Sequence, residues 1–120
     1  MTTITSSIQE NKDTLDKIPE TEIAFSSGDT VKEITINANA LTNRIVLKLP
    51  VFSGAIITAM LTIEDSDGNE IFRQAGLVED ETHVMIDEVE LIGDNIFKVT
   101  LSTDPLSSGS CFLSGFLKGV

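Results

Sequence analysis

The stretch IITAMLTIEDSDGNEIFR, residues 56–73, contains two alternating segments on either side of an acidic turn. From Ile57 to Ile63 every second residue is apolar, which is the period of a β-strand. Asp67-Gly68 then separates this segment from a second, shorter one. Asp-Gly between two such segments is a strong hairpin signal, because glycine adopts a positive φ without a Cβ clash. The stretch therefore predicts two antiparallel strands joined by a tight turn.

The chain after residue 21 repeats this pattern of short alternating segments. Ile45 and Leu47, for example, fall on one face of their segment and Arg44 on the other. Turn residues separate the segments, and no helical period follows Pro19. We predict an all-β fold, an antiparallel β-sandwich with Ig-like or jelly-roll connectivity. About eight short strands are expected, at residues 22–25, 30–37, 43–50, 55–64, 70–73, 83–91, 95–102 and 111–120.

The first 20 residues have a different pattern. Ser7 and Glu10 have the spacing of a capping box, and Pro19 would end a helix. A helix of about three turns is marginal alone in water, so it needs a surface to lie on. That surface is either the chain's own sandwich, residues 21–120, or a neighbouring subunit. We predict a short amphipathic helix or arm over residues 1–20 whose apolar stripe is Ile4, Ile8, Leu15 and Ile18.

Length and charge restrict the function. The chain has 120 residues, which suits one domain, and 19 acidic against 8 basic residues, a net charge of −11. Such a surface repels phosphates, so neither nucleic acid nor an anionic membrane is an expected partner. No apolar run approaches the ~18 residues of a membrane span. The N-terminal residues lack the features of a secretory signal, so synthesis in the cytoplasm is expected.

The acidic turn raises the question of a cation site. Its candidate ligands are Asp65, Asp67 and Glu70. An EF-hand loop would need a glutamate six positions after the glycine, where this chain has Gln74. The pattern favours a plain hairpin turn. A calcium-dependent binding or adhesion module using this loop is the alternative function.

Residues for catalysis are few. A Ser-His-Asp triad would have to use the single histidine, His83, which is expected to be an exposed strand residue. A zinc site needs several His or Cys ligands, and only His83 and Cys111 exist. Cys111 has no disulfide partner and is expected to pack in the core. We therefore expect no enzyme activity and no cofactor.

The last segment, CFLSGFLKGV, is apolar on both faces. A strand of a two-sheet sandwich usually has one face in water, so another surface is expected to cover the outer one. The cover is either the N-terminal stripe or a second subunit. A separate run, residues 79–94, holds seven acids and no base, which indicates a solvated face or a surface for a basic partner. We predict a homo-oligomer with contacts at Ile4, Ile8, Leu15, Ile18, Phe112 and Phe116.

Three segments resemble small virion proteins of tailed bacteriophages, particularly the capsid decoration or cement class. They are ITAMLTIEDSDGNEIF at 57–72, IFKVTLSTDPLSSGS at 96–110 and FLSGFLKGV at 112–120. The resemblance is one of pattern, without a diagnostic motif, and transfers no functional residue. It implies a β-sandwich made in the bacterial cytoplasm that binds an assembled shell in the virion, often as a trimer, with a major capsid or other virion protein as partner. We therefore predict a non-enzymatic structural protein that decorates or cements a larger assembly.

Overall fold

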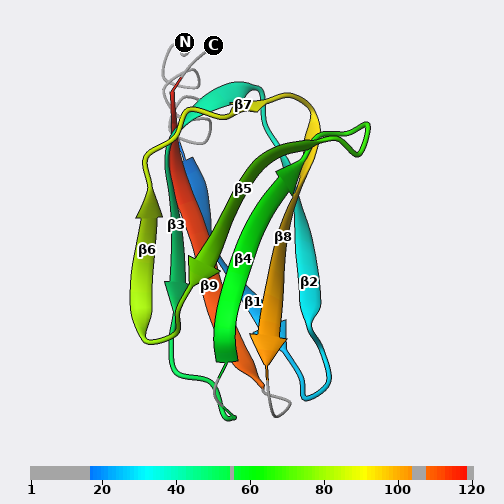
Figure 1. The fold of residues 1–120 in the computed structure, drawn as a ribbon. Helices are drawn as coiled ribbons and strands as arrows, with labels where there is room; N and C mark the ends of the chain where they lie inside the picture. Colours follow the sequence, from blue (N-terminus) through cyan, green and yellow to red (C-terminus); the bar gives the residue numbers. More distant parts are fainter. Residues whose placement is uncertain (1–16, 55, 104–107, 119–120) are drawn as a thin grey trace.

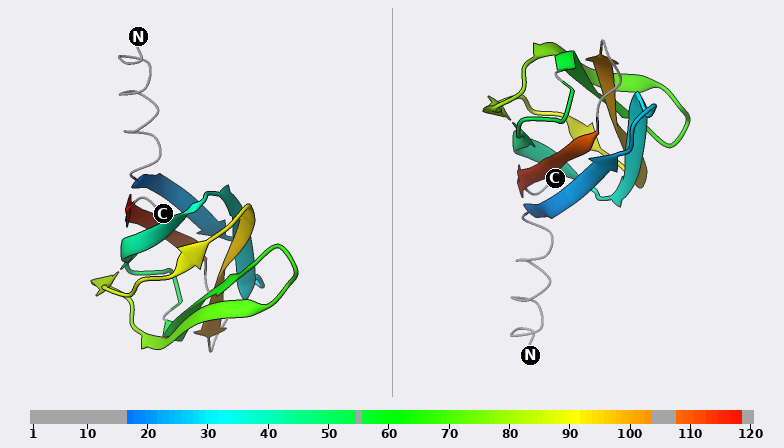
Figure 2. Two further views of the ribbon diagram at one scale, coloured as in Figure 1. Left: turned by 90° about the horizontal axis from the view of Figure 1, so that it is seen from above. Right: turned by 90° about the horizontal axis from the view of Figure 1, so that it is seen from below.

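The computed structural model describes residues 17–54, 56–103 and 108–118, which form nine strands in two antiparallel sheets (Figure 1). The two sheets pack face to face as layers, seen end-on in Figure 2. The predicted all-β sandwich is confirmed. The strands are β1 (Lys17–Phe25), β2 (Val31–Asn37), β3 (Ala40–Leu49), β4 (Ile56–Glu64), β5 (Glu70–Leu77), β6 (Glu81–Met85), β7 (Glu90–Leu91), β8 (Asp94–Thr103) and β9 (Gly109–Lys118).

The strand order identifies which of the two predicted connectivities is present. One sheet has the order β1-β9-β3-β6, with the short β7 also paired to β3, and the other has β2-β8-β4-β5. When β7 is set aside, the first strand pairs with the last, the second with the next to last, and so on inward to the β4–β5 hairpin. This nested pairing of eight strands across two sheets is a jelly roll.

The predicted hairpin at the acidic turn is confirmed. The backbone N–H of Asp65 donates to the carbonyl of Asn69 at 2.8 Å, and that of Gly68 donates to the carbonyl of Asp65 at 3.0 Å. Gly68 has a φ of 86°, the left-handed conformation that favours glycine in this turn. The Asp65 carboxylate also accepts the N–H groups of Asp67 and Asn69, both at 2.9 Å. The Asp65 carboxylate thus shapes the backbone of the turn.

The core lies between the sheets and follows the predicted alternation. Cys111 belongs to it, as expected, and burial raises the pKa of its thiol to about 12. The largest fully buried apolar side chains come from both layers: Ile45, Leu47, Leu49, Leu61, Ile63, Leu91, Phe97, Val99 and Leu113.

The first strand begins earlier than the sequence predicts. β1 starts at Lys17, so the last four residues of the predicted arm are in the sandwich. Ile18 lies opposite Gly115 of β9 and is only 3% exposed. A Cβ at Gly115 would come within 3.3 Å of Ile18, so the glycine makes room for this side chain. Pro19 lies at a bulge of an edge strand, where it does not break a required backbone hydrogen bond.

The expected strand over residues 83–91 is two strands, β6 and β7. Between them the chain is held by Thr42, which is fully buried in β3. Its hydroxyl donates to the carbonyl of Asp87 at 2.5 Å and accepts the N–H of Val89 at 2.8 Å. These two side-chain hydrogen bonds thus add to a backbone one, from the Thr42 N–H to the Val89 carbonyl at 2.9 Å, and the apolar alternation alone did not indicate them.

The remaining arm residues, including Ile4, Ile8 and Leu15, lie outside the described residues. Within the described part of the chain, no helix is long and apolar enough to cross a membrane.

Candidate interaction surfaces

The outer side of the β1-β9-β3-β6 sheet presents phenylalanines beside cations. The register places Arg44 of β3 opposite Phe116 of β9, and Lys48 opposite Phe112. Between these two pairs, Val46 lies in register with Ser114 and with Val84 of β6. Directly opposed side chains of neighbouring strands lie on the same face and touch. We call this surface the stacked face: Arg44, Val46, Lys48, Val84, Phe112 and Phe116.

The cations of the stacked face lie over the aromatic rings. The Arg44 Cζ atom is 5.0 Å from the centroid of the Phe116 ring, and the Lys48 Nζ atom is 5.9 Å from that of Phe112. Cation–π pairs at exposed sites contribute about 0.5–1 kcal/mol, and the aliphatic stems cover part of each ring. Even so, Phe116 remains 45% exposed and Val84 50% exposed. The stacked face is therefore both apolar and positively charged.

Its positive charge is only partly balanced on the same face, by Glu22 of β1, which lies in register with Phe112 and accepts a hydrogen bond from the Ser110 hydroxyl at 2.6 Å. Among the described residues, neither Arg44 nor Lys48 forms a salt bridge, and neither does Lys17, which lies in register with Phe116 at the sheet edge. Lys118, at the end of β9, does pair with Glu88. The stacked face thus combines three cations without salt bridges in the described part of the chain with one exposed ring, Phe116, and one half-buried ring, Phe112.

The outer side of the other sheet is neutralised by ion pairs. Lys98, in the central strand β8, contacts Glu64 at 3.0 Å and Glu33 at 4.0 Å. The hydrogen bond to Glu64 raises the pKa of the Lys98 ammonium. On β5, Arg73 donates two hydrogen bonds to the Glu70 carboxylate, at 2.8 and 2.9 Å. Cations and acids on this side are thus paired with each other.

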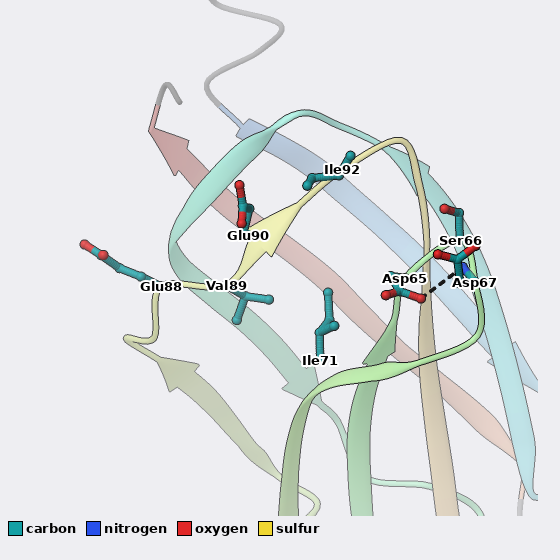
Figure 3. A pocket seen from close by; sticks show the side chains of 8 residues that line it. All are labelled: Asp65, Ser66, Asp67, Ile71, Glu88, Val89, Glu90 and Ile92. Atoms are coloured by element: carbon teal, nitrogen blue, oxygen red, sulfur yellow. Dashed lines mark hydrogen bonds between the residues drawn. The ribbon is translucent and has the colours of Figure 1, made fainter.

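A hollow of about 390 Å³ lies at the end of the sandwich, between the β4–β5 turn and β7 (Figure 3). Figure 3 shows Asp65 and Asp67 of the turn on one side, Glu90 of β7 and Glu88 of the preceding loop on the other, and Ile71 between them. Ile71 is 36% exposed and Ile92 59% exposed, so the lining is apolar as well as acidic. We call this surface the acidic hollow: Asp65, Ser66, Asp67, Ile71, Glu88, Val89, Glu90 and Ile92.

The structure does not bring the predicted cation ligands together. The Asp65 carboxylate binds backbone N–H groups of its own turn, and these bonds, led by that from Asn69, lower its pKa. Glu70 is paired with Arg73 instead of facing the aspartates. Within the ranges that the structure describes, no group of three or more His, Cys, Asp and Glu side chains is placed to hold a metal ion. The loop is a hairpin turn with a self-contained hydrogen-bond pattern.

His83 is not the exposed strand residue that the sequence suggested. It is half-buried, and its Nε2 atom lies 2.8 Å from the carbonyl oxygen of Val78 and 3.1 Å from the Val78 backbone nitrogen. The imidazole therefore fastens the turn between β5 and β6. Cys111, the other candidate ligand, lies in the core, where its thiol is 3.8 Å from the Ile23 carbonyl oxygen.

The predicted contact residues that the structure describes fall into two groups. Phe112 and Phe116 are on the outer face of their strand, as the alternation indicated, with Leu113 and Leu117 buried on the other side. Ile18 packs inside its own sandwich and is not available to a second subunit. The stacking of Arg44 and Lys48 on the phenylalanines could not be anticipated, because it depends on the register between β3 and β9.

The sequence matches no protein-family model and no curated protein sequence. Among solved structures, the fold is similar to VP2 of infectious bursal disease virus. The subviral particle of VP2 is 15% identical with a TM-score of 0.35, covering 82% of this chain and 30% of that chain. Mutant VP2 in T=1 particles is 14% identical with a TM-score of 0.38, covering 83% and 31%. The chain thus spans less than a third of these proteins, and we base the functional inference on its own surface.

Proposed function

We propose that this chain is a non-enzymatic structural subunit that decorates or cements a larger particle, with a tailed-bacteriophage capsid as that particle. Its partners are further copies of itself, as a trimer, and a major capsid or other virion protein. The stacked face carries the proposal, because Phe116 and Val84 are about half exposed on an open sheet face. Contiguous apolar surface rimmed by polar groups is typical of protein–protein contact sites.

The fold by itself does not select this function. Jelly rolls occur in shell proteins, in lectins and in cupins, so the connectivity is compatible with several activities. The surface is more selective. On the other outer face of this sandwich, Lys98 is paired with Glu64. The stacked face is instead left with unpaired cations and partly open rings.

The N-terminal arm would supply a second contact. It joins the sandwich at Lys17, which lies in register with Phe116, so the arm begins at the rim of the stacked face. Ile4, Ile8 and Leu15 provide apolar side chains at helical spacing. We propose that the arm reaches a neighbouring subunit and that Ile18, being buried, anchors its base.

Self-association is tested by the mass of the full-length chain in solution, measured by size-exclusion chromatography with light scattering. We expect a closed oligomer, with a lower mass when Phe112→Ser and Phe116→Ser are combined or when Ile4, Ile8 and Leu15 are all changed to Ser. The matched control is Val31→Ser, because Val31 is 46% exposed on the opposite sheet. A monomeric wild-type chain at about 100 µM, well above a micromolar Kd, would contradict the oligomer.

Decoration is tested by adding the purified chain to shells assembled from the major capsid protein of the same source. We expect it to sediment with the shells and to raise the temperature at which they break. The Phe112→Ser/Phe116→Ser chain should do both less well. Shells that neither bind nor gain stability from the wild-type chain would refute the decoration role, whatever the oligomeric state.

A further inference from the structure

We propose that copies of this chain associate head to tail, with the stacked face of one copy bound in the acidic hollow of the next. This deepens the proposed function and rests on it, since it specifies how the subunits contact one another.

The two surfaces are complementary in charge. The stacked face and its rim carry Arg44, Lys48 and Lys17 without salt-bridge partners in the described part of the chain. In the acidic hollow, the carboxylates without a salt bridge, again among residues described by the structure, are Asp65, Asp67 and Glu90. Only Glu88 is neutralised, by Lys118.

The two surfaces also match in their apolar content. The phenylalanines of one face have their counterpart in Ile71 and Ile92, which are exposed at the lining of the other. In each case charged and apolar side chains are neighbours, and on the stacked face Arg44 and Lys48 of β3 lie between the phenylalanines of β9 and Val84 of β6. Packing one on the other would cover aromatic and aliphatic surface and pair charges that are otherwise unpaired.

A symmetric contact is disfavoured by the same charges. If two stacked faces met, the cations Arg44, Lys48 and Lys17 of both copies would outnumber the one acid in register on that face, Glu22, and two acidic hollows would bring carboxylates together. Opposed like charges at an interface cost several kcal/mol in general. The head-to-tail contact instead places the cations of one copy against the carboxylates of the next. Figure 1 shows the β4–β5 turn and β7, which line the hollow, at one end of the sandwich, whereas the register places the stacked face on the outer side of the β1-β9-β3-β6 sheet. Each copy can therefore use both surfaces, and in the proposed trimer the repeated contact closes into a ring of three copies.

The test is a charge exchange in the full-length chain. The first variant reverses the stacked face with Arg44→Glu and Lys48→Glu, and the second reverses the hollow with Asp67→Lys and Glu90→Lys. Asp65 is kept, because its carboxylate shapes the turn. We expect each variant to weaken association by tenfold or more, on the order of one lost charge pair. The chain with all four changes should regain association, since the attraction is restored with its sign exchanged.

The matched control is Lys32→Glu with Arg73→Glu. It changes the net charge of −11 by the same amount as the first variant, but at cations that belong to the β2-β8-β4-β5 sheet and already have acidic partners. We expect its association to match the wild type. Thermal melts of each monomer confirm that the fold is retained. If a reversed variant does not fold, the milder Arg44→Gln/Lys48→Gln and Asp67→Asn/Glu90→Gln chains replace it.

The wild-type chain provides an independent measurement. A contact built on exposed charges should weaken as NaCl rises from 50 to 500 mM, because salt screens such pairs. An association that is unchanged or strengthened by salt would overturn the head-to-tail contact. The contact would also be overturned if the chain with all four charge reversals did not regain association. If the wild type associates and both charge-reversed variants associate equally well, only the head-to-tail contact is wrong. If the wild type is monomeric, the proposed self-association is wrong with it.

Discussion

The two outer faces of the sandwich show opposite uses of the same residue types. On the β2-β8-β4-β5 side, Lys98 lies between Glu64 and Glu33, and the local charges are balanced. On the β1-β9-β3-β6 side, Arg44 and Lys48 lie over phenylalanine rings instead of carboxylates. The first face is stable in water as it stands. The second keeps both apolar area and positive charge available, which is why we assign the contact surface to it.

The comparison shows that exposure and composition alone do not identify a contact surface. Each face has cations in its strands, and strand alternation directs them outward on both. What differs is the cross-strand neighbour, because Lys98 has Glu33 directly opposite and Glu64 diagonally across, whereas Arg44 has Phe116 opposite. An acid across the strand neutralises a lysine, whereas a phenylalanine leaves its charge in place.

The largest expected effect is a loss of folding stability that differs between the buried and the outer side of β9. Leu113 is fully buried between the sheets, so Leu113→Ala should lower the free energy of unfolding by about 2–5 kcal/mol. Phe116→Ala, on the outer side of the same strand, should cost less than about 1.5 kcal/mol and instead weaken association. Urea unfolding at low protein concentration measures both. Equal losses would mean that the stacked face supports the fold instead of contacts.

The next effect concerns the boundary of the acidic hollow. Thr42→Val keeps the shape but removes the hydroxyl that binds the carbonyl of Asp87 and the N–H of Val89. Leaving buried backbone groups without partners should cost about 1–3 kcal/mol. Hydrogen exchange should show faster opening of the Val89 amide, while the β2-β8-β4-β5 sheet stays protected. Unchanged exchange at Val89 would show that β7 is held by other contacts.

A smaller effect compares the cations of the two faces directly. Lys98→Met leaves Glu33 and Glu64 without their shared partner, so it should lower the melting temperature more than Arg44→Met, which removes only a stacking contact. Association should respond in the reverse order, with Arg44→Met the more harmful. If the same variant were the more harmful both to the melting temperature and to association, the two faces would not differ in role.

The smallest effect is the pH dependence at Asp65. Backbone hydrogen bonds lower its pKa in the folded protein below the ordinary value of 3.8. The resulting stabilisation is present above pH 3.8 and is lost as the pH falls through the lower folded pKa. The melting temperature of Asp65→Asn should therefore lie slightly below that of the wild type at pH 7 and approach it in acid. A difference that stays constant down to pH 2 would rule out this contribution from the carboxylate charge.

Much of the fold was predictable because its signals are local. The alternation in β3, β4, β8 and β9, the Asp-Gly turn and the burial of Cys111 all depend on residues near one another in the chain. The errors have specific causes. Ile18 matched a helical stripe by spacing, but pairing with β9 placed it in a strand beside Gly115. Thr42 gave no signal, because its partners Asp87 and Val89 are remote in the sequence.

The amino-acid sequence by itself determined that this chain forms a two-layer sheet structure, since a period of two with glycine and aspartate turns leaves few other ways to bury its aliphatic residues. Tertiary structure alone decided the jelly-roll order, the position of the cations over Phe112 and Phe116, and the gathering of Asp65, Asp67 and Glu90 around one hollow. The physical reason is that register between distant strands sets which side chains meet. That register follows from the packing of the whole core, and no short segment contains it.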